Sequence, residues 1–245
     1  MKKTFLLSCL MLAAMPVMAA YTGHVYVDKN KNGVFDQSEK PLAGIKVSDG
    51  LNVVETAADG SFTLPGHERE RFIFITTPSG YKTFNRHYHK IEKKQSGYDF
   101  GLIPYSGRIR KDGSHRYIHI ADTEIFNTEN HADWVNNVRD YARNEQAAFI
   151  IHTGDICYEK GLKAHIKLMN TENMDCPVFY CIGNHDLVKG KYGEELFESI
   201  YGPVYYSFDA GNVHYVVTPM PGGDHAPGYT SDDVCRWLKN DLTHI

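Results

Sequence analysis

The sequence predicts a multi-domain protein, with a small all-β sandwich over residues 21–105 and an α/β domain over residues 106–245. Short β-type runs with turn residues, and no candidate helix, fill the first part. In the second part strands alternate with helices. Pattern-breaking Pro and Gly in residues 101–113 indicate a linker between the two. A length of 245 residues with 42% hydrophobic and 23% charged residues excludes disorder, collagen and coiled coil as overall classes.

The first domain is predicted to be β because apolar residues fill short runs separated by turn residues. Residues 71–75 are apolar on both faces, as in the core strand of a sandwich. Asp49-Gly50 and Asp59-Gly60 each lie between two such runs, and Asp-Gly in that position is a strong hairpin signal. We therefore predict two hairpins. The predicted strands cover residues 23–27, 45–47, 53–56, 61–64 and 71–75.

Residues 1–20 have the pattern of a secretory signal peptide, with Lys2 and Lys3, an apolar stretch and the small residues Ala19 and Ala20. We therefore expect an exported protein, periplasmic or extracellular. The apolar stretch continues past Cys9, which argues against a lipoprotein signal. It is too short to cross a bilayer, and no other segment is long and apolar enough, so no membrane span is predicted.

Four cysteines remain after the signal. In an oxidising compartment they can pair in three ways, and their spacing favours none of them. Cys157 and Cys181 lie in or beside apolar runs, which favours buried thiols. The formal charge of −4, without a basic run, argues against a nucleic-acid-binding surface. The four are Cys157, Cys176, Cys181 and Cys235.

A loop in the first domain matches the calcium-binding pattern D-x-[DN]-x-[DN]-G-x5-E at every position. A strand precedes it and Pro41 follows it, so the loop is not an EF-hand. Two interpretations stay open: a calcium site weakened by two neutral Asn ligands, or a polar loop whose side chains bond to its own backbone. The candidate calcium ligands are Asp28, Asn30, Asn32, Asp36 and Glu39.

The second domain alternates predicted strands and helices. A helix is predicted over residues 129–146, with Trp134, Val138 and Tyr141 on its packing face at i, i+4 and i+7. The other predicted helices cover residues 162–169 and 194–200. The predicted strands cover residues 115–120, 149–151, 178–182, 205–208 and 213–217.

Polar residues follow three of these strands. Asp122 and Glu124 follow the first, Asp155 follows the second, and Asn184 and His185 follow the third. Each alone is well explained as a cap or turn residue, but the carboxyl ends of such strands meet at one edge of a sheet. Carboxylates gathered there without Lys or Arg require cations. Two divalent ions bridged by one carboxylate supply them, and also lower the pKa of a bound water.

The segments with Asp122, Gly154-Asp155 and Gly183-Asn184-His185-Asp186, each after an apolar strand, resemble the calcineurin-like metallophosphoesterases. That family has the motifs D-x-H, G-D and G-N-H-[DE], then a histidine and G-H-x-H. The resemblance covers residues 115–245. The earlier stretch around residues 41–50 resembles the β-sandwich domain that precedes some exported members.

The resemblance implies a four-layer αββα sandwich and two divalent metal ions (Mn, Fe, Zn or Mg). It implies that Asp122 holds the first metal, Asp155 bridges both and Asn184 binds the second. His185 is then the acid that protonates the leaving oxygen, oriented by Asp186.

The sequence departs from the family pattern in two places. Glu124 occupies the histidine position of D-x-H, and since a glutamate can ligate metal it stays a candidate ligand. The chain stops at Ile245, before the later histidine motifs. We therefore expect the phosphoesterase domain to be incomplete at its C-terminus, and two outcomes stay open for the 245-residue chain, an active hydrolase or an inactive one.

Two hypotheses of function follow. The leading one is an exported metal-dependent hydrolase of phosphate mono- or diesters, in which a metal-bound hydroxide attacks phosphorus and His185 donates a proton to the leaving group. Its partner is a phosphate-ester substrate, and no partner protein is predicted. The rival is a calcium-binding β-module for surface binding, attached to a catalytically dead phosphoesterase remnant.

Overall fold

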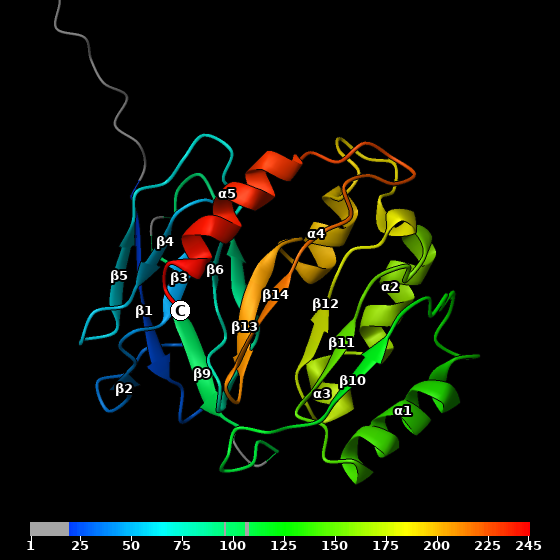
Figure 1. Ribbon diagram of the computed structural model, residues 1–245, viewed down its shortest axis with the longest axis horizontal. Coiled ribbons are helices and arrows are strands. Elements are labelled where there is room, and N and C mark those ends of the chain that lie inside the picture. Colours follow the sequence, from blue (N-terminus) through cyan, green and yellow to red (C-terminus); the bar gives the residue numbers. More distant parts are fainter. Residues whose placement is uncertain (1–19, 96, 106–107) are drawn as a thin grey trace, which may run out of the picture.

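A computed structural model describes residues 20–95, 97–105 and 108–245, and its first part consists of two sheets packed face to face (Figure 1). Val25, Val47, Ile73 and Leu102 are among the buried residues between them. One sheet has the order β2-β1-β9-β7 with β5 also paired to β1, and the other has the order β4-β3-β6-β8. The strands are β1 (Tyr21–Val27), β2 (Lys40–Pro41), β3 (Lys46–Ser48), β4 (Val53–Glu55), β5 (Ser61–Leu64), β6 (Phe72–Ile75), β7 (Tyr81–Thr83), β8 (Tyr88–Lys90) and β9 (Phe100–Pro104).

Of the two predicted hairpins, the structure contains one. At Asp49-Gly50 the chain turns back and β3 pairs antiparallel with β4, as predicted. The hairpin predicted at Asp59-Gly60 is wrong, because β5 pairs with β1 instead of β4. The Asp59-Gly60 turn carries the chain from one sheet of the sandwich to the other, a change of partner that local turn chemistry does not reveal.

The predicted linker begins later than expected. Residues 101–104 belong to β9, which pairs in parallel with β1 and antiparallel with β7. β9 is thus an interior strand of its sheet. Pro104 is tolerated because it is the last residue of the strand.

The second part places a parallel sheet, β10-β11-β12, between helices and a β-hairpin. Ile150 and Val178 pack toward the helices, whereas Phe149 and Phe179 pack toward the hairpin and α5. The resulting layers confirm the predicted α/β architecture of this part. The elements are β10 (Tyr117–Ile120), α1 (Ala132–Asn144), β11 (Phe149–His152), α2 (Tyr158–Leu168), α3 (Thr171–Met174), β12 (Val178–Tyr180), a 3-10 turn (Asn184–Asp186), α4 (Glu195–Tyr201), β13 (Tyr206–Ala210), β14 (Val213–Val217) and α5 (Ser231–Leu242).

The packing face predicted for the first of these helices is wrong for Trp134 and Tyr141 and correct for Val138. Trp134 and Tyr141 are 41% and 60% exposed, whereas Val135 and Ala142 are buried against the sheet with Val138 beside them. The buried stripe therefore runs i, i+3, i+7 through small side chains. These allow α1 to approach the sheet more closely than an aromatic face would.

Strand β6 joins the two domains because both of its faces are buried. Ile73 and Ile75 point into the sandwich core, while Phe72 and Phe74 join the cluster that includes Phe208 and Trp237 of the second domain. Figure 1 shows the β13–β14 hairpin lying between the N-terminal sheets and the parallel sheet. Residues 71–75 are thus apolar on both faces because one face packs in the sandwich core and the other contacts the second domain.

An arginine beside β6 faces two buried carboxylates of the second domain. Arg71 lies 2.9 Å from Glu194 and 2.7 Å from Glu198, and these glutamates are 0% and 5% exposed. One guanidinium cannot neutralise two carboxylates. Burial, with a contribution from the charge of Glu194, raises the pKa of Glu198 to about 7 against the opposing effect of Arg71.

Residues 1–19 of the predicted signal peptide, including Cys9, lie outside the residues that the structure describes. Cys157, Cys176, Cys181 and Cys235 are all free thiols in the structure. Among the described helices, none has the length and apolar character needed to cross a membrane.

The shared charge at the domain interface predicts a pH-dependent stability. Folded Glu198 keeps its proton up to a pH of about 7, whereas an ordinary glutamate has a pKa of 4.5. Its contribution is therefore complete below about pH 4.5 and is lost as pH rises through about 7. We expect Glu198→Gln to remove a decline on the order of 1–3 kcal/mol in the free energy of unfolding between pH 5 and pH 8.

Urea unfolding at both pH values measures this change. Glu195→Gln, a more exposed position on the same helix, is the matched control and should keep the decline of the parent chain. An unaltered pH dependence in Glu198→Gln contradicts the account of the interface.

Candidate metal centre

The ends of three parallel strands bring the predicted polar residues to one edge. Ile120, His152 and Tyr180 are in register at the last residues of β10, β11 and β12. Backbone bonds continue the alignment past the strands, since the Asp122 N–H donates to the Gly154 carbonyl over 3.1 Å. The segments 121–124, 153–155 and 181–186 therefore leave the sheet side by side.

The backbone at this edge is held in an unfavourable conformation. Among the described residues, left-handed φ angles at non-glycine positions concentrate here, and each costs about 1–2 kcal/mol. Such residues persist only where their surroundings determine them, and they gather at functional sites. The residues concerned are Asp122 (φ 53°), Glu124 (φ 46°), Asp155 (φ 52°), Cys157 (φ 76°) and Tyr158 (φ 57°).

Two glycines let the second and third segments touch. A Cβ atom on Gly183 would lie 2.2 Å from both the amide nitrogen and Oδ1 of Asp155, and a Cβ on Gly154 would lie 2.3 Å from the Gly183 nitrogen. The His185 N–H in turn donates to Asp155 Oδ1 over 3.2 Å. Asp155 is thus packed directly against the segment that carries Asn184 and His185.

A buried histidine ties the first and second segments together. His152 is 0% exposed, its Nδ1 accepts the Gly154 N–H over 3.2 Å, and its Nε2 lies 3.0 Å from Thr123 Oγ1. Because Nδ1 accepts a hydrogen bond, the proton lies on Nε2 and is donated to Thr123. Burial lowers the pKa of His152 to about 3, so the ring is neutral. It therefore braces the residues beside Asp122, Glu124 and Asp155 without adding positive charge.

The carboxylates of this edge have no cationic side chain as a partner. Asp122 and Glu124 are exposed and Asp155 is half-buried. In the described part of the chain, no Lys or Arg forms an ion pair with any of the three. Burial raises the pKa of the neighbouring Cys157 thiol to about 12, with further contributions from Asp186, these three carboxylates and no positive charge.

His185 is oriented by a residue that the sequence analysis did not find. Its Nδ1 lies 2.9 Å from Asp224 Oδ2, and this hydrogen bond is the main cause that raises the pKa of His185. The prediction that Asp186 orients His185 is wrong. The Asp186 carboxylate is fully buried and accepts the N–H groups of Gly183 and Cys157 over 2.9 and 2.8 Å. It fastens two segments together, whereas Nδ1 of the imidazole pairs with Asp224.

The donor set suits divalent cations. Unpaired carboxylates, an amide oxygen and an imidazole are ligands for Mg, Mn, Zn or Fe ions. The structure joins the His185 N–H to Asp155 and places Asn184 on the same turn as His185, with Asp122 and Glu124 on the adjoining segment. Their individual roles as ligands stay a prediction.

A second group of possible ligands lies in the N-terminal domain. Ligand atoms of Asp49, His67 and Glu70 all lie within 4.8 Å of one another. Asp49 already accepts the backbone N–H groups of Leu51 and Asn52 over 3.0 and 2.7 Å. The His67 backbone N–H also donates a hydrogen bond to the Glu70 carboxylate. The group holds a turn in place, and the sequence contains no spacing motif that marks it.

The predicted calcium loop is closed by its own hydrogen bonds. The buried Asp28 carboxylate accepts the N–H groups of Asn32 and Gly33, and Glu39 accepts those of Lys29 and Asp36. Asp36 accepts the side-chain amides of Asn30 and Asn32 over 2.8 and 3.0 Å. This is the geometry of the polar-loop interpretation, and calcium binding by these five residues stays a prediction.

The contact between Gly183 and Asp155 generates a prediction. In Gly183→Ala the added methyl group would clash with Asp155. The substitution should therefore lower the free energy of unfolding by about 1–3 kcal/mol and weaken Mn²⁺ binding. Gly97→Ala in the N-terminal domain is the matched control, since a Cβ there has no heavy atom within 4 Å. Urea unfolding and calorimetry with Mn²⁺ measure both effects. Equal stability and Mn²⁺ affinity in the two variants would show that the segments are not in contact as described.

Comparison with protein families assigns both parts of the chain. Residues 29–104 match the N terminal of calcineurin-like phosphoesterase, and residues 115–239 match calcineurin-like phosphoesterase itself. No curated protein gives a match. The second match covers just over half of the 245 residues and confirms the resemblance drawn from the motifs. The chain therefore belongs to the calcineurin-like phosphoesterase family and carries the N-terminal domain associated with it.

Proposed function

We propose that the residues at the carboxyl edge of β10-β11-β12 hydrolyse phosphate mono- or diesters with two divalent cations. Family membership makes the protein a metal-dependent phosphoesterase in general terms. The observation that carries the finer proposal is the set of unpaired carboxylates at that edge, beside an amide and an imidazole. A phosphate ester brings further negative charge, so a site of this kind acts on it only with cations bound.

The proposed roles follow from position. Asp122 and Glu124 would hold one cation, Asp155 would be the ligand shared by both, and Asn184 would hold the other. When bound, the cations neutralise the carboxylates, withdraw charge from the phosphoryl oxygens and lower the pKa of a water molecule. The packing of Gly154 and Gly183 keeps Asp155 close to the Asn184 segment.

His185 is the proposed general acid. Asp224 accepts a hydrogen bond from Nδ1, which orients the ring and favours its protonated form. Nε2 is then the atom that donates a proton to the departing oxygen. General acid catalysis of this kind contributes roughly 100-fold to 10,000-fold, and most where the leaving group is a poor one.

Export to the periplasm or the outside of the cell belongs to the proposal as well. Its support is the signal-peptide pattern of residues 1–20, which stands on sequence alone.

The bridging role of Asp155 is tested by hydrolysis of p-nitrophenyl phosphate with Mn²⁺. We expect a Mn²⁺-dependent rate that falls at least roughly 100-fold in Asp155→Asn, because one neutral oxygen replaces the charge between the cations. Asp140→Asn on the outer surface of α1 is the control and should keep the rate of the parent chain. Equal rates in Asp155→Asn and the parent chain would refute the assignment.

The rival hypothesis makes the opposite prediction for the same preparation. A calcium-binding module with a dead remnant would bind Ca²⁺, lose that binding in Asp28→Ala, and bind no Mn²⁺. Calorimetry with each ion in turn separates the two. We expect Mn²⁺ binding that depends on Asp155.

A further inference from the structure

The segment that carries Asp224 is an irregular stretch between β14 and α5. The Asp224 N–H donates to the Asn184 carbonyl over 3.1 Å, and a Cβ on Gly223 would lie 2.4 Å from the same oxygen. The segment 219–229, here called the Asp224 loop, therefore lies directly on the residues proposed to act at the metal centre. Whatever holds this loop also sets the position of Asp224 beside His185.

The base of the Asp224 loop is held at Gly228 by two side chains. The Gly228 N–H donates to both carboxylate oxygens of Glu194, over 3.1 and 2.9 Å. The Gly228 carbonyl accepts Arg69 Nη2 over 3.1 Å. Both polar groups of this residue are thus occupied, one by the second domain and one by the first.

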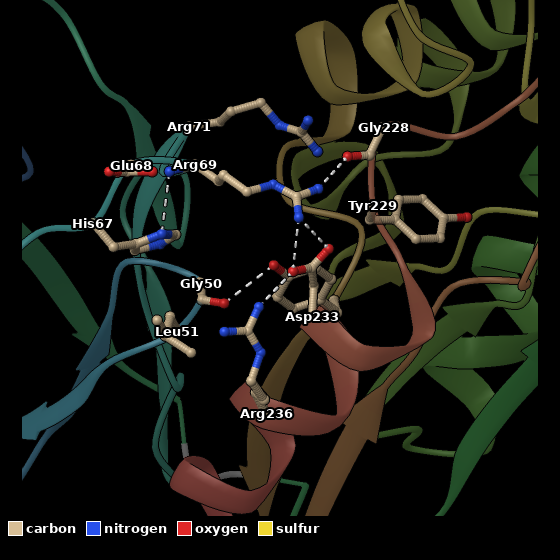
Figure 2. Close-up of a pocket in the computed structure, with 11 residues that line it drawn as sticks. Gly50, Leu51, His67, Glu68, Arg69, Arg71, Gly228, Tyr229, Asp233 and Arg236 are labelled. Atoms are coloured by element: carbon tan, nitrogen blue, oxygen red, sulfur yellow. Dashed lines mark hydrogen bonds and ion pairs between the residues drawn. The ribbon is translucent and has the colours of Figure 1, made fainter.

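Two arginines of the N-terminal domain reach across to this point. Arg69 also pairs with Asp233 in the first turn of α5 at 3.0 Å, and Arg71 pairs with Glu194 at 2.9 Å. Figure 2 shows both guanidinium groups projecting from the N-terminal domain toward Gly228 and Asp233. Arg69 therefore holds Gly228 directly, and Arg71 fixes the carboxylate that holds its N–H.

These arginines line a cleft of about 560 Å³ between the domains. Its cations are already partnered, since Arg236 pairs with Asp232 and Asp233 at 3.1 and 2.8 Å, and Arg71 and Arg69 pair as described. The arginines of the cleft therefore neutralise carboxylates of the second domain, and Arg69 and Arg71 thereby hold the Asp224 loop against the N-terminal domain.

We infer that Arg69 and Arg71 are positioning residues through which the N-terminal domain holds Asp224, and so His185, in place for catalysis. This inference rests on the proposed role of His185 as general acid. It gives the N-terminal domain a part in the reaction although none of its described residues lies at the metal centre.

Arg69→Met is the primary variant for testing this. It removes the bond to the Gly228 carbonyl, keeps the length of the apolar stem, and leaves Asp233 paired with Arg236. Arg71→Met leaves the buried carboxylates of Glu194 and Glu198 without a cationic partner and is expected to unfold part of the chain. It is therefore used only as a second variant, combined with Glu198→Gln. Arg116→Met, an exposed arginine paired with Glu145 at 2.8 Å, is the matched control.

Hydrogen exchange measured by mass spectrometry reports how firmly the Asp224 loop is held, and it does not require an active enzyme. We expect exchange over residues 219–229 to become about tenfold faster in Arg69→Met, with no change in β10 or β11. Arg69→Lys, which keeps a donor, should restore part of the protection. Unchanged exchange in the Asp224 loop overturns the inference.

Hydrolysis of two esters gives the catalytic readout. A misplaced general acid should slow an alkyl phosphate more than p-nitrophenyl phosphate, whose leaving group hardly needs a proton. We expect the alkyl-to-aryl rate ratio to fall at least about fivefold in Arg69→Met and to stay at the parent value in Arg116→Met. A ratio equal to that of the parent chain overturns the coupling to His185. Absence of hydrolysis in the parent chain would count against the proposed function, while the exchange result still decides whether the loop is held.

Discussion

Negative charge without a protein counter-charge is the constraint on which this structure depends. Two buried carboxylates elsewhere are met by arginine or by backbone N–H groups, Glu194 by Arg71 and Asp186 by Gly183 and Cys157. At the carboxyl edge of β10-β11-β12 the carboxylates have neither a lysine nor an arginine in the described residues. On the proposed function, positive charge comes from solution as bound divalent cations, and the protein provides the geometry for them.

The surrounding residues are arranged to maintain that geometry while adding no positive charge of their own. Strained left-handed residues aim the side chains, paired glycines allow two segments to touch, and a neutral buried His152 braces them. Buried Asp186 performs a similar function through the backbone. The cost of these features is borne by the large apolar clusters on either side of the sheet, which include Phe149 and Ile150.

The strand-end motifs could be predicted because their chemistry is local: Gly154-Asp155 and the segment that begins at Gly183 each follow an apolar strand directly. The partner of His185 could not, because Asp224 lies 39 residues away on an irregular loop without a motif. The buried face of α1 was missed for a related reason. Aromatic residues such as Trp134 recur at helical spacing and favour one face, and only the contact with the sheet shows that the adjacent face, with small residues, is buried. The ion pairs that Arg71 forms with Glu194 and Glu198 between the domains could not be predicted from the sequence either.

The central claim is that this edge of the sheet holds two divalent cations. Anomalous X-ray scattering from crystals of the chain grown with Mn²⁺ tests it most directly, because it locates the ions without reference to activity. The account predicts two anomalous peaks beside Asp122, Asp155 and Asn184, with Asp155 contacting both. An empty edge, with Mn²⁺ found only at Asp49, His67 and Glu70, would contradict it.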